Sequence, residues 1–263
     1  MNFNNKIVWI TGASSGIGEA LAYAFAKQGA KLVLSARREN ELQRVKNGCT
    51  GSPDILLLPF DLEDTSKVDI LTQQVIKYFG RIDILINNGG ISQRSLTKDT
   101  PIELDRKLME VNYFSYVALT KSLLPQFIKQ NSGHIVVISS IAGKFGFHLR
   151  SGYSASKHAL HGFFESMRME VYDNNIQVLM VCPGKIKTNV SINAITESGA
   201  KLNEMEASHE KAMSGEDCAA QIVRAISKNK YEVFIGGGEL NAVRLKRFFP
   251  NLFFRIIRKV KSN

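Results

Sequence analysis

Tyr153 and Lys157 are the two side chains of this sequence whose types and spacing are best suited to moving a proton. Residues four apart lie on the same face of a helix, so the phenol and the ammonium are expected to be neighbours. A free tyrosine has a pKa of about 10 and is a poor acid or base at neutral pH. A cation one turn away favours the phenolate, so we expect Lys157 to lower the pKa of Tyr153. A phenol tuned in this way can exchange a proton with an alcohol or carbonyl oxygen.

A Tyr-x3-Lys pair alone is usually structural, so this interpretation needs further support. Polar residues at the ends of two predicted strands provide it. Ser140 directly follows the apolar run Gly133–Ser139, and Asn88, Gly89 and Gly90 follow the run that ends at Asn87. In open α/β sheets the ligand crevice lies outside the carboxyl ends of the strands. Ser140 could there donate a hydrogen bond to an oxygen on which charge develops. Asn112 lies in the long helix predicted over Pro101–Lys129.

A glycine-rich turn follows the first apolar run of the chain. Its spacing is G-x3-G-x-G, and a helical pattern begins at once after it. Glycines permit a tight turn and let the backbone approach a pyrophosphate, which is bound at the N-terminus of the following helix. The turn therefore predicts a dinucleotide site that includes Gly12, Ser14, Ser15, Gly16, Ile17 and Gly18.

The end of the second apolar run indicates which dinucleotide is bound. A site for NAD would carry an Asp or Glu there to bind the ribose 2′-hydroxyl. This chain has Arg37 and Arg38 instead, and the stretch Leu34–Arg38 contains no acid. A guanidinium suits a 2′-phosphate, so the two arginines favour NADP(H) over NAD(H). The alternative is that both only solvate the start of a helix, where cations are slightly unfavourable.

Apolar runs alternate with helical patterns along the chain, and these elements must position the polar residues. The predicted strands are Lys6–Thr11, Lys31–Ser35, Ile55–Phe60, Asp83–Asn87, Gly133–Ser139, Ile176–Cys182 and Tyr231–Ile235. Each is a continuous apolar run, which is typical of strands covered on both faces in a parallel sheet. We predict an α/β fold: a single-domain Rossmann-type doubly wound parallel sheet of about seven strands, over residues 1–239.

Composition excludes several classes of protein. The 263 residues are 44% hydrophobic and 22% charged, which is ordinary for a globular domain. The three cysteines have no CxxC spacing, so we expect neither a disulfide framework nor a metal site, and a reducing compartment fits best. Residues that carry chemistry begin by Thr11, which leaves no room for a signal peptide, and no apolar run is long enough to span a bilayer.

The net charge of +10 resides mostly in the last 24 residues, 240–263, which hold seven basic residues and no acidic one. The rest of the chain is nearly balanced, which argues against a nucleic-acid partner. After Pro250 the apolar residues Leu252, Phe253, Ile256, Ile257 and Val260 share one helical face, opposite Asn251, Arg255, Arg258, Lys259 and Ser262. This amphipathic basic helix could dock on its own domain, on a second subunit, or on an anionic membrane surface.

The polar segment 188–215 is too long for an inert connector, and we interpret it as a lid over the substrate. It mixes apolar side chains with charged ones, which would suit an apolar or lipid-like substrate.

Taken in order and spacing, these motifs resemble those of the short-chain dehydrogenase/reductase family over roughly residues 5–236. The resemblance implies that Tyr153 is the acid/base, that Lys157 lowers its pKa and holds the nicotinamide ribose, and that Ser140 orients the substrate carbonyl. It further implies that Asn112 holds a water that relays protons through Lys157. The cofactor contacts that it adds are Asp61 and Leu62 at the adenine, Asn88, Gly89 and Gly90 at the adenosine ribose side, and Pro183, Gly184, Ile186 and Thr188 towards the nicotinamide.

A narrower resemblance is to the dehydrogenase/reductase member 7 and 7B branch, carried by Ile91–Arg94, Tyr153–Ala159 and Thr188–Thr196. We expect an NADP(H)-dependent oxidoreductase that interconverts a ketone or aldehyde and an alcohol. The alternatives are an NADP(H)-binding sensor or scaffold without turnover, and a reductase of 3-oxoacyl groups on a carrier protein. The family further implies a homodimer or homotetramer. We expect a cytoplasmic protein that either stays free or associates peripherally with a membrane.

Overall fold

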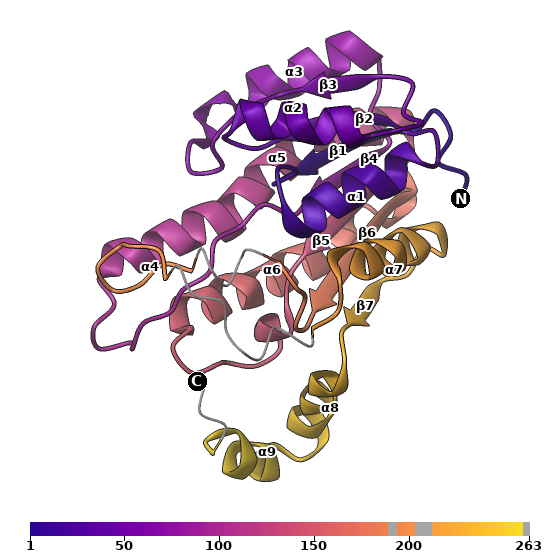
Figure 1. The fold of residues 1–263 in the computed structure, drawn as a ribbon. Helices are drawn as coiled ribbons and strands as arrows, with labels where there is room; N and C mark the ends of the chain where they lie inside the picture. Colours follow the sequence, from indigo (N-terminus) through magenta and orange to yellow (C-terminus); the bar gives the residue numbers. More distant parts are fainter. Residues whose placement is uncertain (189–193, 203–211, 260–263) are drawn as a thin grey trace.

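Seven parallel strands form one sheet in the order β3-β2-β1-β4-β5-β6-β7 (Figure 1). The structure is a computed structural model, and it describes residues 1–188, 194–202 and 212–259. The strands are β1 (Ile7–Thr11), β2 (Lys31–Ser35), β3 (Ile55–Leu57), β4 (Ile84–Asn87), β5 (Gly133–Ile138), β6 (Ile176–Pro183) and β7 (Glu232–Ile235). The predicted fold, one Rossmann-type domain with a parallel sheet of seven strands, is confirmed.

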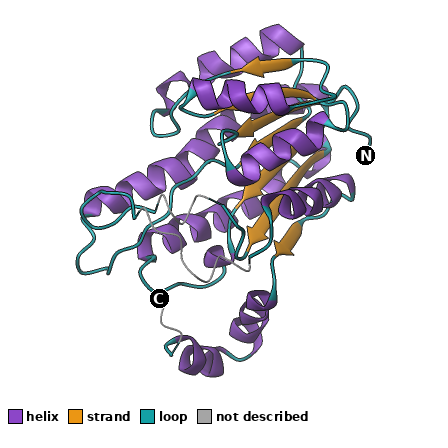
Figure 2. Cartoon of the chain, in the orientation of Figure 1, coloured by secondary structure: helices purple, strands orange, loops and turns teal. Residues whose placement is uncertain are grey.

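Helices cover both faces of the sheet, as Figure 2 shows. The helices α1 (Gly16–Ala26), α2 (Glu39–Gly48) and α7 (Gly215–Ser227) pack on one face. The helices α3 (Val68–Phe79), α5 (Ser115–Gln130) and α6 (Ser151–Glu170) pack on the other. Along β1, Val8 and Ile10 enter the first core while Ile7 and Trp9 enter the second. This two-sided burial explains why the strands read as continuous apolar runs.

The topology fixes the place of the site. Strand β1 pairs with β2 on one side and with β4 on the other, so the winding of the chain reverses at β1. In such sheets a crevice opens outside the carboxyl ends of the strands at this switch point. The glycine-rich turn follows β1, and Asn88 to Gly90 follow β4, so both motifs meet at this edge.

The long helix predicted over Pro101–Lys129 is interrupted. It consists of α4 (Ile102–Met109), a wider π-helical turn over Glu110–Phe114, and α5. Single π turns inside α-helices occur often at functional sites. This one carries Asn112, whose side chain is fully buried. One extra residue shifts the apolar face by about 100°, and the few apolar residues on either side do not mark such a shift clearly in the sequence.

The helix expected after Pro250 forms, and a second short helix, which is not predicted from the sequence, precedes it. Helix α8 (Asn241–Phe248) follows the 3₁₀ turn η6 (Gly238–Leu240), and α9 (Pro250–Ile257) follows after Phe249. Both lie beyond the carboxyl end of β7, outside the layered body of the domain (Figure 1). Among the described helices, none is both long and apolar enough to cross a membrane.

Candidate active site

One cleft of about 720 Å³ runs along the carboxyl edge of the sheet. It brings together nearly all of the predicted site residues. The predicted residues that line it are Gly12, Ser14, Ser15, Gly16, Ile17, Arg37, Arg38, Asp61, Leu62, Asn88, Gly89, Gly90, Ser140, Tyr153, Lys157, Pro183, Gly184, Ile186 and Thr188. Gly18 and Asn112 are the two that lie behind its wall.

The glycine-rich turn is shaped for close backbone approach. Gly12 and Gly16 have positive φ angles of 63° and 58°, which side-chain-bearing residues rarely adopt. A Cβ atom on Gly12 would lie 2.5 Å from the Cα of Gly89, and one on Gly18 would lie 2.2 Å from the carbonyl oxygen of Gly12. Gly18 therefore serves the packing of α1 on the turn, one of the known uses of the third glycine.

The first turn of α1 presents backbone N–H groups to the cleft. Ser15 is the N-cap residue, and its side chain caps none of these groups. Uncapped N–H groups and the helix dipole together favour an anion such as a pyrophosphate. Thr11 connects this turn to the residues that follow β4, because its Oγ1 accepts hydrogen bonds from the N–H groups of Asn88 (2.9 Å) and Gly89 (3.2 Å). The residues present fit the phosphates of a dinucleotide.

Basic residues lie at the end of the cleft expected to hold the adenosine. Arg37 and Arg38 are exposed at its rim, and the guanidinium of Arg37 lies 3.9 Å from the carboxylate of Asp61. At this distance and exposure the pair is weak, so Arg37 is available to another anion. A Cβ atom on Gly89 would lie 2.5 Å from the Cδ1 of Leu62, so glycine here leaves room for that side chain.

Tyr153, Ser140 and Lys157 meet at the other end of the cleft. The Ser140 side chain lies close enough to the Tyr153 hydroxyl to lower the pKa of that phenol, and the Ser140 Oγ accepts a hydrogen bond from the N–H of Ala142 at 3.1 Å. Lys157 donates a hydrogen bond of 2.9 Å to the backbone oxygen of Ile138 and lies 5.9 Å from the centre of the Tyr153 ring. The three side chains come from η3 (Ile141–Gly143), whose N-cap is Ser140, and from α6.

Lys157 is not among the groups that shift the pKa of Tyr153 in this structure, so the expected lowering of that pKa is not observed. Burial raises the pKa of Tyr153, and Ser140 and Arg150, which oppose this shift, do not overcome it. Burial also lowers the pKa of Lys157 to about 7, because a charged ammonium loses its hydration there. Lys157 is thus only partly charged at neutral pH, and its hydrogen bond goes to Ile138 rather than to the phenol.

Asn112 lies behind Lys157 and fastens two segments of the site. Its Oδ1 accepts from the N–H of Ile91 at 2.9 Å, and its Nδ2 donates to the oxygen of Ile91 at 3.0 Å. The same Nδ2 donates to Ser156 Oγ at 3.0 Å. The side chain thereby holds the segment after β4 against α6, and its role in proton relay stays a prediction.

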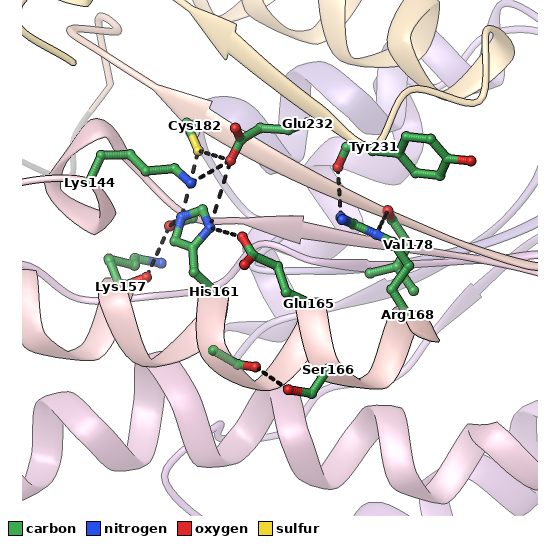
Figure 3. A network of polar contacts seen from close by, with 12 residues as sticks. Lys144, Lys157, His161, Glu165, Ser166, Arg168, Val178, Cys182, Tyr231 and Glu232 are labelled. Atoms are coloured by element: carbon green, nitrogen blue, oxygen red, sulfur yellow. Dashed lines mark hydrogen bonds and ion pairs between the residues drawn. The ribbon is translucent and has the colours of Figure 1, made fainter. Parts of the chain in front are cut away.

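Ser139 also lines the cleft, but it is buried and its hydroxyl contacts His161, whose network of polar contacts is drawn in Figure 3. Its Oγ donates to the backbone oxygen of Lys157 at 3.2 Å and lies 3.2 Å from Nε2 of His161. His161 Nε2 lies 3.7 Å from the thiol of Cys182, and Lys144 forms an ion pair of 2.6 Å with Glu232. Burial lowers the pKa of His161 to about 4, so its ring is neutral at physiological pH.

This network has a structural role. Ser139 follows β5, Lys144 follows η3, and the other members lie on α6, β6 and β7, so the network ties these elements together beside Ser140 and Lys157. His161, Cys182 and Glu232 are also the one group of metal-ligating type among the described residues. The Lys144 ammonium already neutralises the Glu232 carboxylate, and we assign no metal to the group.

Comparison with known proteins decides the family. The family model described as short chain dehydrogenase matches residues 6–198, which is most of the chain. The chain belongs to the short-chain dehydrogenase/reductase family. This is a family of oxidoreductases with a Rossmann-type fold that binds a nucleotide cofactor.

Curated relatives of this short-chain dehydrogenase carry the names of the branch suggested by its motifs. The dehydrogenase/reductase SDR family protein 7-like of Anopheles gambiae is 42% identical, over 98% of this chain and 84% of that protein. The family member 7B of Mus musculus is 40% identical, over 98% and 84%. The family member 7 of Homo sapiens is 46% identical, over 88% and 70%.

Solved structures agree on the fold of this short-chain dehydrogenase. A short-chain dehydrogenase of Streptomyces avermitilis is 28% identical with a TM-score of 0.79, covering 98% of this chain and all of that one. A short-chain dehydrogenase/reductase of Burkholderia phymatum, solved in complex with NAD, has a TM-score of 0.84 at 22% identity, over 100% and 98% of the two chains. At that identity the second match bears on the fold alone.

The structure also shows site residues of this short-chain dehydrogenase that the motifs do not reveal. Glu239 accepts hydrogen bonds at one oxygen from the N–H groups of Lys185 (2.8 Å) and Gly237 (3.1 Å). Burial raises the pKa of Glu239, but the backbone donors outweigh burial and the pKa is lowered overall. Glu239 therefore holds the Gly184–Lys185 turn in the cleft wall. A lone glutamate after the last strand gives no signal of this role in the sequence.

Tyr116 and Ile195 also lie at the site without being part of any sequence motif. The Tyr116 ring is fully buried in α5, and its centre lies 5.3 Å from Nζ of Lys157, so it backs the lysine as an ordinary core residue would. Ile195, within the predicted lid 188–215, lines the cleft and exchanges two backbone hydrogen bonds of 2.8 Å with the Ser92–Arg94 segment. Residues 189–193 and 203–211 of the lid lie outside the described residues, and its closure stays a prediction.

Proposed function

We propose that this short-chain dehydrogenase is an NADP(H)-dependent enzyme that interconverts a ketone or aldehyde and an alcohol, on an apolar or lipid-like substrate. The observation that carries the proposal is that Ser140, Tyr153 and Lys157 line the same cleft as the glycine-rich turn. A dinucleotide bound along this cleft, with its pyrophosphate at the turn, would extend towards the hydroxyls of Ser140 and Tyr153.

The nicotinamide supplies the hydride when the cofactor is bound, and the chain's own residues handle the proton and the oxygen. Tyr153 holds a proton on its hydroxyl, because burial keeps the pKa of this phenol above its ordinary value. It can therefore give that proton to a carbonyl oxygen as negative charge develops there. Ser140 offers a second hydroxyl to the same oxygen. Lys157, behind the phenol, donates towards the cofactor ribose and favours the phenolate once its own ammonium is formed.

The preference for NADP(H) rests on Arg37 and Arg38. The residues at the end of β2 that line the cleft are Ala36, Arg37 and Arg38, and none of them is acidic. An arginine pair can take a 2′-phosphate with charge-assisted hydrogen bonds, whereas the ribose 2′-hydroxyl of NAD(H) would find no carboxylate acceptor there.

The substrate class and the setting of the enzyme are part of the proposal. Ile91, Val111, Ile186 and Ile195 give the cleft apolar walls, which suits an apolar substrate. We place the enzyme in the cytoplasm, as a homodimer or homotetramer, with peripheral contact to a membrane through its tail. Segment 188–215 would act as the lid over the bound substrate.

Two other functions compete with this one. A sensor or scaffold without turnover would need the cofactor site but would not need Ser140, Tyr153 and Lys157 together in the same cleft. A reductase of carrier-bound 3-oxoacyl groups would use the same chemistry, and the basic charge would suit an acidic carrier protein.

A turnover screen tests the proposal. NADPH oxidation by the purified protein is followed with apolar ketones and aldehydes, small polar carbonyls and carrier-bound 3-oxoacyl groups, with NADH in parallel. We expect turnover of the apolar class, faster with NADPH at equal concentration. Tight NADPH binding without turnover across the panel would contradict an enzymatic role and favour the sensor, and turnover of carrier-bound groups alone would favour the third function.

A further inference from the structure

The C-terminal helices present two different surfaces. The inner one is docked: Phe253 is 2% exposed, and its ring meets that of Phe145 edge-on with the centres 5.1 Å apart. Ile257, one turn later, packs on the same cluster. The ammonium of Lys246 donates a hydrogen bond of 2.7 Å to the backbone oxygen of Lys144. Docking of this segment on its own domain, one of the expected alternatives, is therefore observed for its inner side.

The outer side is apolar and exposed. Phe248, Phe249, Leu252, Phe254 and Ile256 are between 47% and 67% exposed, and all five fall within nine residues. Phe248 and Phe249 lie at the corner between α8 and α9, and Leu252 and Ile256 lie one turn apart on α9. Large apolar side chains that are exposed together in one short segment of a folded domain mark a candidate site of interaction.

Basic residues lie among these side chains. Arg244, Arg247, Arg255, Arg258 and Lys259 are exposed, and within the described part of the chain none of them forms an ion pair. Residues 240–263 contain no acidic residue. We call these five basic and five apolar residues the tail surface.

We propose that the tail surface docks on an anionic lipid bilayer, with its phenylalanines and aliphatic side chains at the acyl boundary and its arginines and lysine at the headgroup phosphates. Interfacial binding of this kind grows with the buried apolar area and with the attraction of basic residues to anionic lipids. Charge argues against a second copy of the chain as the occupant. A two-fold contact joins the same patch on both subunits, which would bring basic residues against basic residues with no acid to compensate.

The inner side of the tail packs next to the segment that carries the proposed active site. Phe145 and Ile141, on which Phe253 packs, belong to the segment between Ser140 and Tyr153. Helices α8 and α9 thus lie beyond the carboxyl edge of the sheet (Figure 1), the edge along which the cleft with Ser140 and Tyr153 runs. A bilayer contact at the tail would place the cleft close to a lipid surface. The importance of bilayer docking for the enzyme rests on the proposed function, but the test of docking needs neither substrate nor turnover.

Vesicle co-sedimentation of the full chain tests the proposal. Phosphatidylcholine vesicles with about a quarter phosphatidylserine are compared with vesicles of phosphatidylcholine alone, at low salt and at 0.5 M salt, an ionic strength that screens most charge attraction beyond about 4–5 Å. We expect binding to the anionic vesicles at low salt, weakened about tenfold or more by the high salt, and little binding to the neutral vesicles.

Two variants separate insertion from charge. Phe248→Asp with Leu252→Asp should reduce binding about tenfold or more, because it removes inserted apolar area. Arg255→Gln with Arg258→Gln should weaken binding to anionic vesicles while leaving the apolar side chains in place. The matched control is Met169→Asp with Tyr172→Asp. Those side chains are 75% and 70% exposed near the C-terminal end of α6, at the opposite edge of the sheet, and this control should bind like the unmodified chain.

The outcomes are decisive in both directions. No sedimentation with anionic vesicles at low salt overturns the proposal, and so does equal loss of binding in the Met169/Tyr172 control. Sedimentation velocity without lipid gives the remaining outcome: if Phe248→Asp with Leu252→Asp turns an oligomer into a monomer, the surface belongs to a second copy. Unchanged NADPH binding by each variant establishes that it is folded.

Discussion

The ammonium of Lys157 lies 5.9 Å from the centre of the Tyr153 ring, yet the one hydrogen bond that this ammonium donates within the described structure goes to the backbone oxygen of Ile138. Helical spacing makes the two residues neighbours but does not make the ammonium a direct partner of the phenol. Burial acts on both groups in the direction of the neutral form: it raises the pKa of Tyr153 and lowers that of Lys157 to about 7. At neutral pH the Tyr153 phenol is therefore protonated, and the Lys157 amine is only partly charged.

The burial of Lys157 predicts how the free energy of unfolding depends on pH. Its pKa is about 7 in the folded protein and 10.5 when exposed, so between these values the unfolded chain binds more protons and stability rises with pH. Below pH 7 the buried ammonium costs stability in full. We expect the free energy of unfolding of the unmodified chain to gain up to about 1.4 kcal/mol per pH unit in this window relative to Lys157→Met.

Urea unfolding of the cofactor-free protein at pH 7, 8 and 9 measures this slope. Lys121→Met, which removes an exposed lysine of α5, is the matched control and should keep the slope of the unmodified chain. Parallel pH dependences for the unmodified chain and Lys157→Met would show that Lys157 is ordinarily charged.

Arg37 and Arg38 predict the cofactor preference. Replacing both by alanine removes the guanidinium groups at the rim of the cleft and leaves the glycine-rich turn intact. We expect the dissociation constant for NADPH to rise about 10- to 100-fold, as lost charge-assisted hydrogen bonds would give, and that for NADH to change less than about threefold. Quenching of protein fluorescence by each dinucleotide measures both constants. Arg224→Ala on the exposed side of α7 is the control, and equal losses for the two cofactors would count against the assignment.

Glu239 predicts a link between the residues after β7 and the cofactor. Its carboxylate holds the N–H groups of Lys185 and Gly237, so Glu239→Ala should loosen the turn at Gly184 and raise the KM for NADPH about tenfold, with a smaller effect on kcat. Glu239→Gln keeps one acceptor oxygen and should retain most of the affinity. Steady-state kinetics of the two variants make the comparison. An unchanged KM in Glu239→Ala, with its melting temperature also unchanged, would remove Glu239 from the site.

The cysteines should be unreactive in the folded protein. All three are buried and free, and burial raises the pKa of Cys49 to about 11 and that of Cys218 to about 12. The pKa of Cys182 is raised further, by burial first and by Glu232. Because the thiolate is the reactive form, a disulfide reagent at pH 8 should react with the folded protein at least about 100-fold more slowly than with a free thiol. After unfolding, the reagent should react with three thiols per chain. Rapid reaction of one thiol in the folded protein would contradict this burial.

The sequence predicts the strands and the cleft well because both depend on local patterns. Continuous apolar runs define the strands, and the glycine-rich turn and Ser140 follow strands whose carboxyl ends meet at one edge. The ends of elements are less well predicted: β3 stops at Leu57 because only three of its residues pair with β2. The interruption at Asn112 and the contacts of Glu239 depend on tertiary packing between segments far apart in the chain, which periodicity does not encode.

Tyr153→Phe tests the central claim most directly. The substitution removes only the hydroxyl, whose pKa is influenced by Ser140, and leaves the ring in place. With the best substrate of the screen, we predict a fall in kcat of about 10²- to 10⁴-fold, as for loss of a general acid, while the dissociation constant for NADPH changes less than about threefold. Turnover within a few fold of the unmodified enzyme, with NADPH bound equally well, would contradict the assignment of Tyr153 as the proton donor.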